Sequence, residues 1–302
     1  MYRIGIDIGG TQLRAAVFTD DLSVVTRVQF PNIRNKGAAE NIDPIIEFIN
    51  SFLSKERQAG SDACSGIGVG CPGPLDFAAG KVLNPPNLFG WDNFELVSYV
   101  EQKTAIKTVL NNDANCAGLA EAKLGAGKNF SSVFYITVST GIGGAFIYKG
   151  EMVNGAHSSA AEVYNLIVCD DAYSRKGANA GSLNEMCGGD ALARQAEEIF
   201  GRPVDAKELY DELCLKEKDP QALQIIGRCF DNLARGIANI ACVVDPDIFI
   251  LGGAIALRSE GFIETLAERA KAYLIHPEAL RIEKARLGED SGLIGAALLV
   301  AV

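Results

Sequence analysis

Four short segments of the chain combine glycines with carboxylate, amide or hydroxyl side chains. The first is Asp7-Ile8-Gly9-Gly10-Thr11-Gln12, at a tight turn between two expected strands. Its glycines let a ligand approach the backbone, and N–H groups turned inward form an anion nest that suits phosphate. Asp7 stands at a strand end, where it could hold Mg²⁺ through water, and Thr11 adds a hydroxyl donor. The alternative is an ordinary hairpin turn.

The second and third segments are also rich in glycine. Ser139 to Gly144 contains Thr140, Gly141, Gly143 and Gly144 and again lies between expected strands. One such hairpin is weak evidence, but two, each opening a lobe, predict two phosphate clamps that face each other across a cleft. Gly252 and Gly253 follow a strand and could admit an adenine or ribose close to the backbone, although such pairs are often simple strand-to-helix turns.

The fourth segment, Asn112-Asp113-Ala114-Asn115, follows an expected strand. A carboxylate at the carboxyl end of a strand lies where α/β proteins bind ligands, and it can accept a hydroxyl proton during phosphoryl transfer. Asp113 is therefore the predicted catalytic base. The alternative is that Asp113 caps the helix that follows.

Alternating and β-branched patterns predict the strands that hold these segments in a first α/β lobe, residues 1–115. Helical spacing from Asn41 to Leu53 supplies a crossover between parallel strands, and composition predicts a helix from Ala114 to Leu124. The expected strands are Tyr2 to Ile8, Ala15 to Phe18, Val24 to Phe30, Gly66 to Gly70 and Thr108 to Leu110.

A second lobe, residues 116–289, repeats this plan, so the two strand-turn-strand units indicate an internal duplication. Strands are expected at Val133 to Val138, Ala145 to Tyr148 and Ile248 to Leu251, with helices at Asp190 to Phe200, Ala206 to Leu215 and about Pro220 to Val244. Gly155 to Gly189 has little periodicity and is a predicted binding loop. The apolar segment at about 290–302 predicts a buried helix that packs back on the first lobe.

Bulk composition limits the functions that need consideration. The chain has 302 residues, 48% hydrophobic and 22% charged, with a net charge of -10. This charge, without a Lys/Arg cluster, argues against a nucleic-acid partner. No apolar run reaches the roughly 18 residues of a membrane span, so no membrane partner and a cytoplasmic location are expected. The eight cysteines form no CxxC or CxC pair and are predicted to be reduced and mostly buried.

DIGGT, the PGP loop, NPPNLFGW, NNDAN, TGIGG and DPDIFILGGA occur in this order and cover essentially the whole chain. Together they resemble the ROK family of bacterial sugar kinases and repressors. The resemblance implies a two-lobed actin-like ATPase (ribonuclease H-like) fold, with ATP and Mg²⁺ as cofactors. It also implies phosphoryl transfer to a hexose or N-acetylhexosamine, as in glucokinases and fructokinases, and a homodimer. It assigns the catalytic base to Asp113 and sugar contacts to Asn112 and Asn87.

The sequence departs from the family pattern in the long loop. Where the family has GExGH, Glu162 matches but Asn165 stands in place of the His, and Asn184 occupies the place of the final Glu in CxCGxxGCxE. In the family, that His and three Cys of the second motif hold a structural Zn²⁺. Cys169 is the only nearby cysteine upstream of Asn184, and one cysteine cannot supply a four-ligand site, so we predict no zinc. His157 and Cys187 lie outside the matched ligand positions. Charge-assisted hydrogen bonds contribute about 1.5–3 kcal/mol each, so Asn165 and Asn184 either weaken sugar binding or adapt it to another hydroxyl pattern. Gln12 stands where many members of the family carry a Lys, and this replacement weakens the expected electrostatic contact with phosphate.

Three functions compete on these grounds. An ATP-dependent sugar kinase uses every motif, and a sugar- or nucleotide-sensing protein with little turnover would explain the altered loop. A DNA-binding repressor is the third function. Repressors of this family carry a helix-turn-helix domain ahead of DIGGT, whereas here DIGGT begins at residue 7, so this function is disfavoured.

Overall fold

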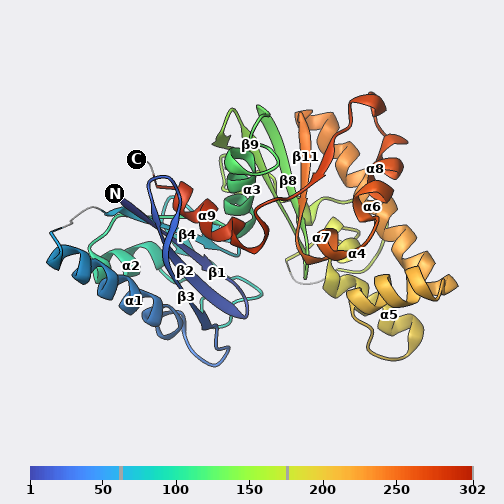
Figure 1. Cartoon of the computed structure of the whole chain (residues 1–302). Helices are drawn as coiled ribbons and strands as arrows, with labels where there is room; N and C mark the ends of the chain where they lie inside the picture. Colours follow the sequence, from blue (N-terminus) through green and yellow to red (C-terminus); the bar gives the residue numbers. More distant parts are fainter. Residues whose placement is uncertain (61–63, 175–176, 301–302) are drawn as a thin grey trace. The chain divides into compact units, whose positions relative to one another are not determined.

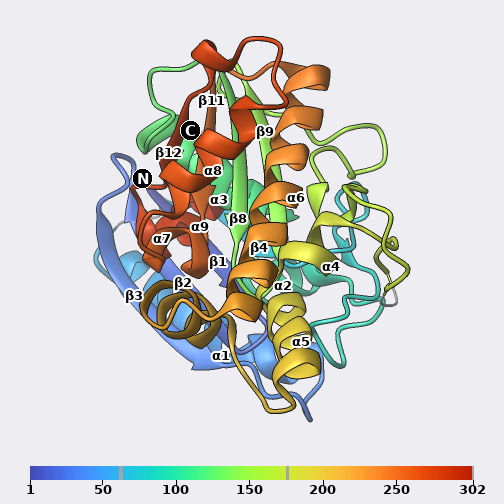
Figure 2. The same ribbon diagram turned by 90° about the vertical axis from the view of Figure 1, so that its right-hand side faces the viewer.

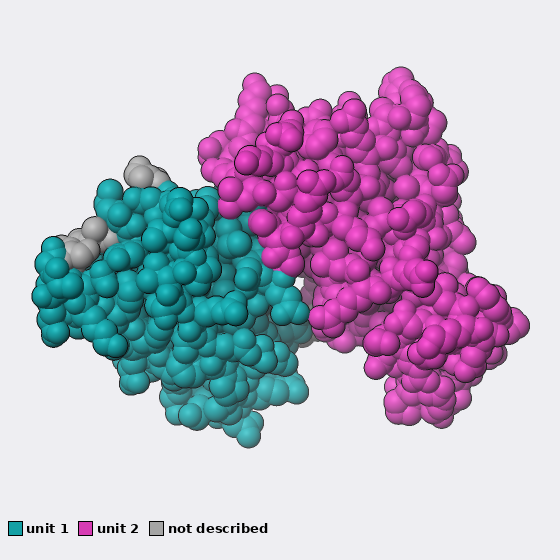
Figure 3. All heavy atoms as spheres, in the orientation of Figure 1, with its two compact units in different colours: residues 1–120, 154–158, 289–302 teal, residues 121–153, 159–288 magenta. Residues whose placement is uncertain are grey.

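The fold is described from a computed structural model, which covers residues 1–60, 64–174 and 177–300. The chain forms two compact α/β units, each with its own five-stranded sheet (Figure 1). Unit 1 contains residues 1–120, 154–158 and 289–302, and unit 2 contains residues 121–153 and 159–288 (Figure 3). Within the described ranges, every helix is too short or too polar to span a lipid bilayer.

The sheet of unit 1 has the strand order β3-β2-β1-β4-β7. The first three strands form the predicted antiparallel meander, and β4 and β7 run parallel to β1, which confirms the expected crossover. These strands are β1 (Tyr2–Ile8), β2 (Gln12–Thr19), β3 (Val24–Pro31), β4 (Cys64–Cys71) and β7 (Thr108–Asn112). A small hairpin of β5 (Leu75–Asp76) and β6 (Lys81–Val82) lies outside this sheet.

Helices cover the sheet of unit 1. The apolar residues of α1 (Ala38–Gln58) and α2 (Leu96–Thr104) join β1, β2 and β4 in one core that includes the fully buried Trp91. The C-terminal helix α9 (Ser291–Leu298) packs on β1 and β4, where glycines allow backbone contact. A Cβ atom on Gly68 would lie only 1.7 Å from the Ala296 carbonyl oxygen. Helix α3 (Asp113–Leu124) follows β7 directly.

Unit 2 repeats the strand order and directions of unit 1, as the predicted duplication requires. Its sheet has the order β10-β9-β8-β11-β12, with β8 antiparallel to β9 and parallel to β11. The strands are β8 (Ser132–Val138), β9 (Ile142–Tyr148), β10 (Glu151–Met152), β11 (Ile248–Gly252) and β12 (Ile282–Lys284). Both Gly-rich turns therefore connect the first two strands of a sheet.

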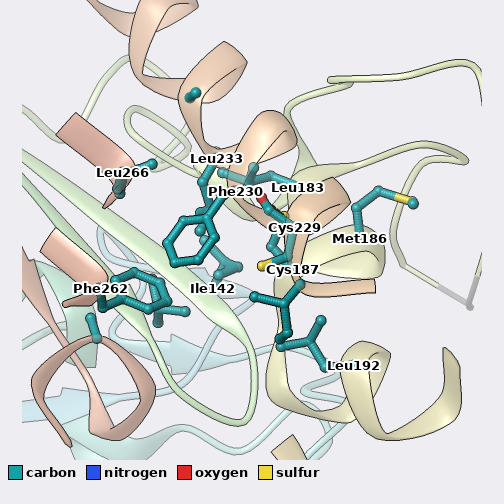
Figure 4. Packing of buried hydrophobic residues seen from close by; sticks show 14 of the residues in the cluster. Ile142, Leu183, Met186, Cys187, Leu192, Cys229, Phe230, Leu233, Phe262 and Leu266 are labelled. Atoms are coloured by element: carbon teal, nitrogen blue, oxygen red, sulfur yellow. Dashed lines mark hydrogen bonds between the residues drawn. The ribbon is translucent and has the colours of Figure 1, made fainter. Parts of the chain in front are cut away.

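The core of unit 2 lies between its sheet and helices that include the long α6 (Pro220–Val244) (Figure 2). Phe230 of α6 contacts Phe262, the first residue of α8 (Phe262–Lys271), with ring centroids 4.9 Å apart, and Leu183 and Cys187 pack nearby (Figure 4). The remaining helices are α4 (Leu183–Cys187), α5 (Gly189–Phe200), the π-helix η2 (Glu208–Lys216), α7 (Ala254–Arg258) and α8 (Phe262–Lys271), with short 3-10 turns η1 (Val163–Asn165), η3 (Pro277–Ala279) and η4 (Gly288–Asp290). All eight cysteines are unpaired and five are buried, as predicted.

Candidate active site

The predicted site residues fall into two groups, one in each unit. Unit 1 holds Asp7, Gly9, Gly10, Thr11, Gln12, Asn87, Asn112 and Asp113, and unit 2 holds Thr140, Gly141, Gly143, Gly144, Glu162, Asn165, Asn184, Gly252 and Gly253. Their proposed roles stay predictions.

The unit 1 group gathers at the carboxyl edge of the parallel strands β1, β4 and β7. Asp7 pairs with Gly70, and Gly70 pairs with Asn111, so these residues lie side by side across the sheet. Neighbouring strands are about 4.8 Å apart, which puts the backbone of Asp7 and Asn111 about 10 Å apart. Asn112 and Asp113 continue from the same edge into α3.

Asp113 is the first residue of α3. Its Oδ1 accepts a hydrogen bond of 2.9 Å from the Ala114 amide. Burial of the carboxyl group, and then the nearby charge of Asp7, raise the pKa of Asp113 to about 6. A carboxylate with a pKa near the working pH is suited to general-base catalysis. Asp113 thus combines the position and the protonation behaviour of a base.

Two cysteines lie close to these carboxylates, at the end of β4 and in the first turn of α3. Burial, followed by the charges of Asp7 and Asp113, raises the pKa of Cys71 and Cys116 well above the usual range. Both thiols therefore stay neutral near pH 7, and neither is activated as a nucleophile.

Asp7 is held by a neighbour that the sequence analysis did not identify. Arg14 lies opposite Asp7 in the β1–β2 register, and its Nε and Nη2 both donate to Asp7 Oδ2. Gly292, in the first turn of α9, faces the same carboxylate, and a Cβ atom there would lie 3.1–3.2 Å from it. The Asp7 carboxylate is thus held between the Arg14 guanidinium and the start of α9. Asp7 and Arg14 are equally far from the turn in the sequence, and this spacing could have predicted that they pair across the hairpin.

The predicted Mg²⁺ role of Asp7 can be tested against its contacts. Oδ2 receives both guanidinium hydrogen bonds, while Oδ1 has no hydrogen bond in the described ranges. Mg²⁺ usually keeps several waters and binds one or two carboxylates together with phosphate oxygens. One carboxylate oxygen is sufficient for water-mediated contact, so Asp7 fits this role. Over residues 1–60, 64–174 and 177–300, no three or more His, Cys, Asp or Glu side chains group as metal ligands.

The turn between β1 and β2 is supported by residues outside it. The Gly9 amide donates to the Gln12 carbonyl at 2.8 Å and closes the turn. Asn32, after β3, donates from its side chain to Gly9 O and from its backbone to Thr11 O, both at 2.8 Å. Gly10, Thr11 and Gln12 are exposed. The turn is thus fixed through its carbonyl groups, while its tip is open to a ligand.

Asn87 lies beside this turn. A Cβ atom on Gly10 would be 3.3 Å from the Asn87 carbonyl oxygen. The segment is anchored by Leu88 and Trp91, whose side chains are buried, whereas Asn87 is exposed. The NPPNLFGW motif therefore presents one amide next to the Gly-rich turn.

Asn112 has a structural role in addition to its predicted sugar contact. Its Oδ1 accepts hydrogen bonds from the Ala114 amide at 2.9 Å and the Asn115 amide at 3.3 Å, so Asn112 caps α3. Its Nδ2 lies close to Gly73 in the PGP loop, 3.6 Å from where a Cβ atom would stand. Because the oxygen is used by the cap, the Nδ2 donor is the part of Asn112 suited to a sugar hydroxyl.

The second Gly-rich turn is fixed by the segment that starts α4 and α5. The Gly189 amide donates to Ser139 O at 2.8 Å, and the Asp190 amide donates to Thr140 O at 3.0 Å. Asn184 Oδ1 accepts from the Ile142 amide at 2.9 Å. A Cβ atom on Gly141 would lie 2.7 Å from that same Oδ1, so the turn rests directly on Asn184.

Of the other predicted nucleotide glycines, several are required by packing. Gly144 is buried, and a Cβ atom there would lie 2.7 Å from the Ala161 carbonyl oxygen. Gly252 faces the Tyr135 hydroxyl, and Gly253 has φ +86° and approaches the Val138 carbonyl. Thr140, Gly141 and Gly143 are exposed or half-buried. The accessible part of this turn is therefore its tip.

The altered loop is closed by hydrogen bonds. Asn165 Oδ1 accepts from the Asn179 amide at 2.6 Å, and Asn179 Nδ2 donates back to Asn165 O at 3.3 Å. Glu162 precedes the 3-10 turn η1 that contains Asn165. Nearby, Ile167 and Ser182 form a β-bridge. Asn165 and Asn184 thus both bond to the protein itself, Asn184 also donating to Glu185 Oε1 at 2.9 Å.

The cysteine and histidine that might replace zinc ligands lie in different settings. Cys187 is fully buried in the unit 2 core, and its Sγ contacts the Cys229 carbonyl at 3.4 Å. His157 is exposed and belongs to unit 1. The absence of zinc stays a prediction.

Comparisons with known proteins identify the family. The model of the ROK family matches residues 3–302. The structure of a ROK hexokinase from Thermus thermophilus is 35% identical with a TM-score of 0.89, covering 99% of this chain and 98% of that one. A ROK glucokinase from Streptomyces griseus, solved with glucose and AMPPNP, is 26% identical with a TM-score of 0.78 over 99% of both chains.

A curated N-acetylmannosamine kinase from Escherichia fergusonii is 30% identical, over 99% of this chain and 98% of that protein. The structural similarity confirms the predicted actin-like α/β fold class, and the family match confirms the resemblance. The chain belongs to the ROK family.

Proposed function

We propose that this protein is an ATP-dependent sugar kinase that phosphorylates a hydroxyl of a hexose or an N-acetylhexosamine. The observation that supports this most is the edge of unit 1, where Asp113, with its pKa raised to about 6, stands beside Asn112 and near Asp7. The similar hexokinase, glucokinase and N-acetylmannosamine kinase act on sugars, and the glucokinase binds an ATP analogue. A homodimer in the cytoplasm is part of the same proposal.

In the reaction, Asp113 accepts the proton of the sugar hydroxyl as its oxygen forms a bond to the γ-phosphorus. The bond between the γ-phosphorus and the β,γ-bridging oxygen breaks, and ADP leaves. Asn112 Nδ2 and Asn87 orient the sugar, and the proposal assigns further sugar contacts to Glu162, Asn165 and Asn184. Positioning and electrostatic stabilisation provide most of the rate enhancement in this chemistry.

ATP is held by exposed turn residues, in this proposal. The residues proposed to contact its phosphates are Gly10 and Thr11 in unit 1 and Thr140, Gly141 and Gly143 in unit 2, through N–H or hydroxyl groups. Gly252 and Gly253 admit the nucleoside. Asp7 would hold Mg²⁺ through water, and the ion would neutralise phosphate charge, while Arg14 orients the Asp7 carboxylate.

A coupled assay of ADP release tests the proposal. Glucose, mannose, fructose, glucosamine, N-acetylglucosamine and N-acetylmannosamine are supplied in turn with ATP and Mg²⁺. At least one sugar is expected to raise ADP production far above background, and Asp113→Asn should abolish that increase. If no sugar does so and Asp113→Asn leaves the background unchanged, the kinase proposal fails.

One observation favours a second function. Asn165 and Asn184 bond to the Asn179 amide and to the Ile142 amide, so these side chains are partly occupied within unit 2. A loop that supplies fewer groups to a sugar suits a sensor with little turnover. In that case sugar binds, measured by calorimetry, without any increase in ADP release.

A further inference from the structure

Behind Asp113 lies a network of asparagine side chains that the proposed mechanism does not use. Asn111 is 5% exposed, and its Oδ1 accepts hydrogen bonds from the Asn112 amide at 2.8 Å and from Asn115 Nδ2 at 2.9 Å. Its Nδ2 donates to Asn154 Oδ1 at 3.0 Å. Asn111 therefore links the start of α3 to Asn154.

This network fixes the residues next to the predicted base. Asn112 caps α3 through its Oδ1, and Asn115 lies in the first turn of α3. Asp113 is placed between them by the backbone. A displacement of Asn111 would release the Asn112 amide and the Asn115 side chain together, and so change the direction of both Asn112 Nδ2 and Asp113.

Asn154 is the outer end of the network and is the less buried partner. It begins the segment 154–158, which belongs to unit 1 although the chain on both sides of it belongs to unit 2. The hydrogen bond from Asn111 is thus a side-chain link between this segment and the NNDAN motif. A side-chain amide with a fixed acceptor is held in one rotamer, and this restricts Asn111.

A second observation concerns an acceptor of this network that has no partner. Asn115 Oδ1 is buried and has no hydrogen-bond partner in the part of the chain that the structure describes. Buried side-chain oxygens are nearly always paired with protein or water. A buried acceptor of this kind is suited to an ordered internal water.

We propose that Asn154 is a positioning residue for phosphoryl transfer, acting through Asn111 to fix Asn112 and Asp113 against the sugar hydroxyl. This inference rests on the proposed kinase function. It requires that loss of the Asn154 acceptor changes the sugar KM and kcat. The KM for ATP, which the proposal assigns to the Gly-rich turns, should not change.

The test compares Asn154→Ala with Asn154→Asp, using the sugar that the wild-type enzyme phosphorylates best. Asn154→Ala removes the acceptor, and the sugar KM is expected to rise and kcat to fall about three- to tenfold each, as for one lost hydrogen bond. The KM for ATP should stay within about twofold. Asn154→Asp keeps an acceptor oxygen and should restore the sugar KM towards the wild-type value.

Asn50→Ala is the matched control, because it deletes a side-chain hydrogen bond to Lys103 O elsewhere in unit 1. It should leave all three kinetic constants within about twofold of wild type. Thermal melting verifies that each variant is folded. If Asn154→Ala does not fold, Asn154→Ser takes its place, since its hydroxyl is too short to reach Asn111.

The outcomes separate this inference from the proposed function. A wild-type enzyme that phosphorylates no sugar ends the kinase proposal and this inference with it. An active wild type with Asn154→Ala unchanged overturns the inference alone. The same holds if the variant loses kcat with both KM values unchanged, which indicates a reduced folded fraction, or if Asn154→Asp behaves as Asn154→Ala.

Discussion

Helix α3 carries a carboxylate near each end, the partly buried Asp113 and the buried Glu121, and the two accept different numbers of hydrogen bonds. At its start, Asp113 accepts a hydrogen bond from one amide outside its own residue, and its pKa is raised to about 6. Eight positions later, Glu121 is 0% exposed and accepts from three amides, those of Ala126, Arg286 and Leu287, at 2.7–3.0 Å. Gly125 leaves room for it, since a Cβ atom there would overlap Glu121 Oε2 at 1.9 Å.

The difference suits Asp113 to a role in the reaction and Glu121 to a role in holding the structure. A carboxylate that accepts hydrogen bonds from three amides connects the segments that provide those amides. A carboxylate with little hydrogen bonding in a buried site is destabilised as the anion and keeps the ability to accept a proton. Both residues lie in the same helix, so their positions in the sequence do not distinguish these two roles.

The largest expected effect is on catalysis, from Asp113→Asn. The amide keeps the shape of the side chain but cannot accept the hydroxyl proton, so kcat should fall by about 10²–10⁴-fold. Steady-state kinetics measures this, with Asp20→Asn, an exposed aspartate at the end of β2, as the control. A kcat within tenfold of wild type would show that Asp113 is not the base.

The next effect is on stability, from Glu121→Gln. The new NH₂ group would face the amide donor that now bonds a carboxylate oxygen, and the charge-assisted bonds would be lost. The free energy of unfolding should fall by about 3 kcal/mol. Urea denaturation measures it, with Glu264→Gln on the exposed face of α8 as the control. The kcat per folded molecule should stay within about twofold, and a large loss of kcat would contradict the assignment of Glu121 to structure.

Asp113→Asn should have the opposite effect on stability. Because the pKa of Asp113 is raised in the folded state, its ionisation costs stability progressively between about pH 4 and pH 6. The cost is complete above about pH 6 and small at pH 4 and below. The variant should therefore be more stable than wild type at pH 8, by on the order of 2 kcal/mol. The difference should become small at pH 4. Urea denaturation at both pH values is the measurement, and an equal or less stable variant at pH 8 would contradict the raised pKa.

The smallest effect concerns the pH dependence of the wild-type enzyme. Asp113 must be ionised to accept a proton, so kcat/KM for the sugar should fall on acidification through about pH 6, by about tenfold per pH unit below it. A plateau that extends unchanged down to pH 5 would mean that the free enzyme holds this carboxyl group at an ordinary pKa. Comparison at constant ionic strength excludes a general salt effect.

Much of this protein was determined by its sequence. The strands of both sheets up to β9, the strand β11 and the helix Pro220–Val244 followed from periodicity, because each buries one face or lies wholly in a core. The ordered motifs were sufficient for the family, and Asp113 was identified from a carboxylate after a buried strand. Helix α2 and strand β12 were missed, since short elements carry little periodic signal.

Only the tertiary structure decided which residues surround the predicted ones. Arg14 against Asp7, Asn154 against Asn111 and Asn184 under the second turn join segments that lie far apart in the chain or on separate strands. It also distinguished Glu121 from Asp113, because the amides around Glu121 include two from about 165 residues away. Local pattern fixes helices and turns through short-range sterics and burial, whereas the state of a buried charge depends on which distant groups the fold brings to it.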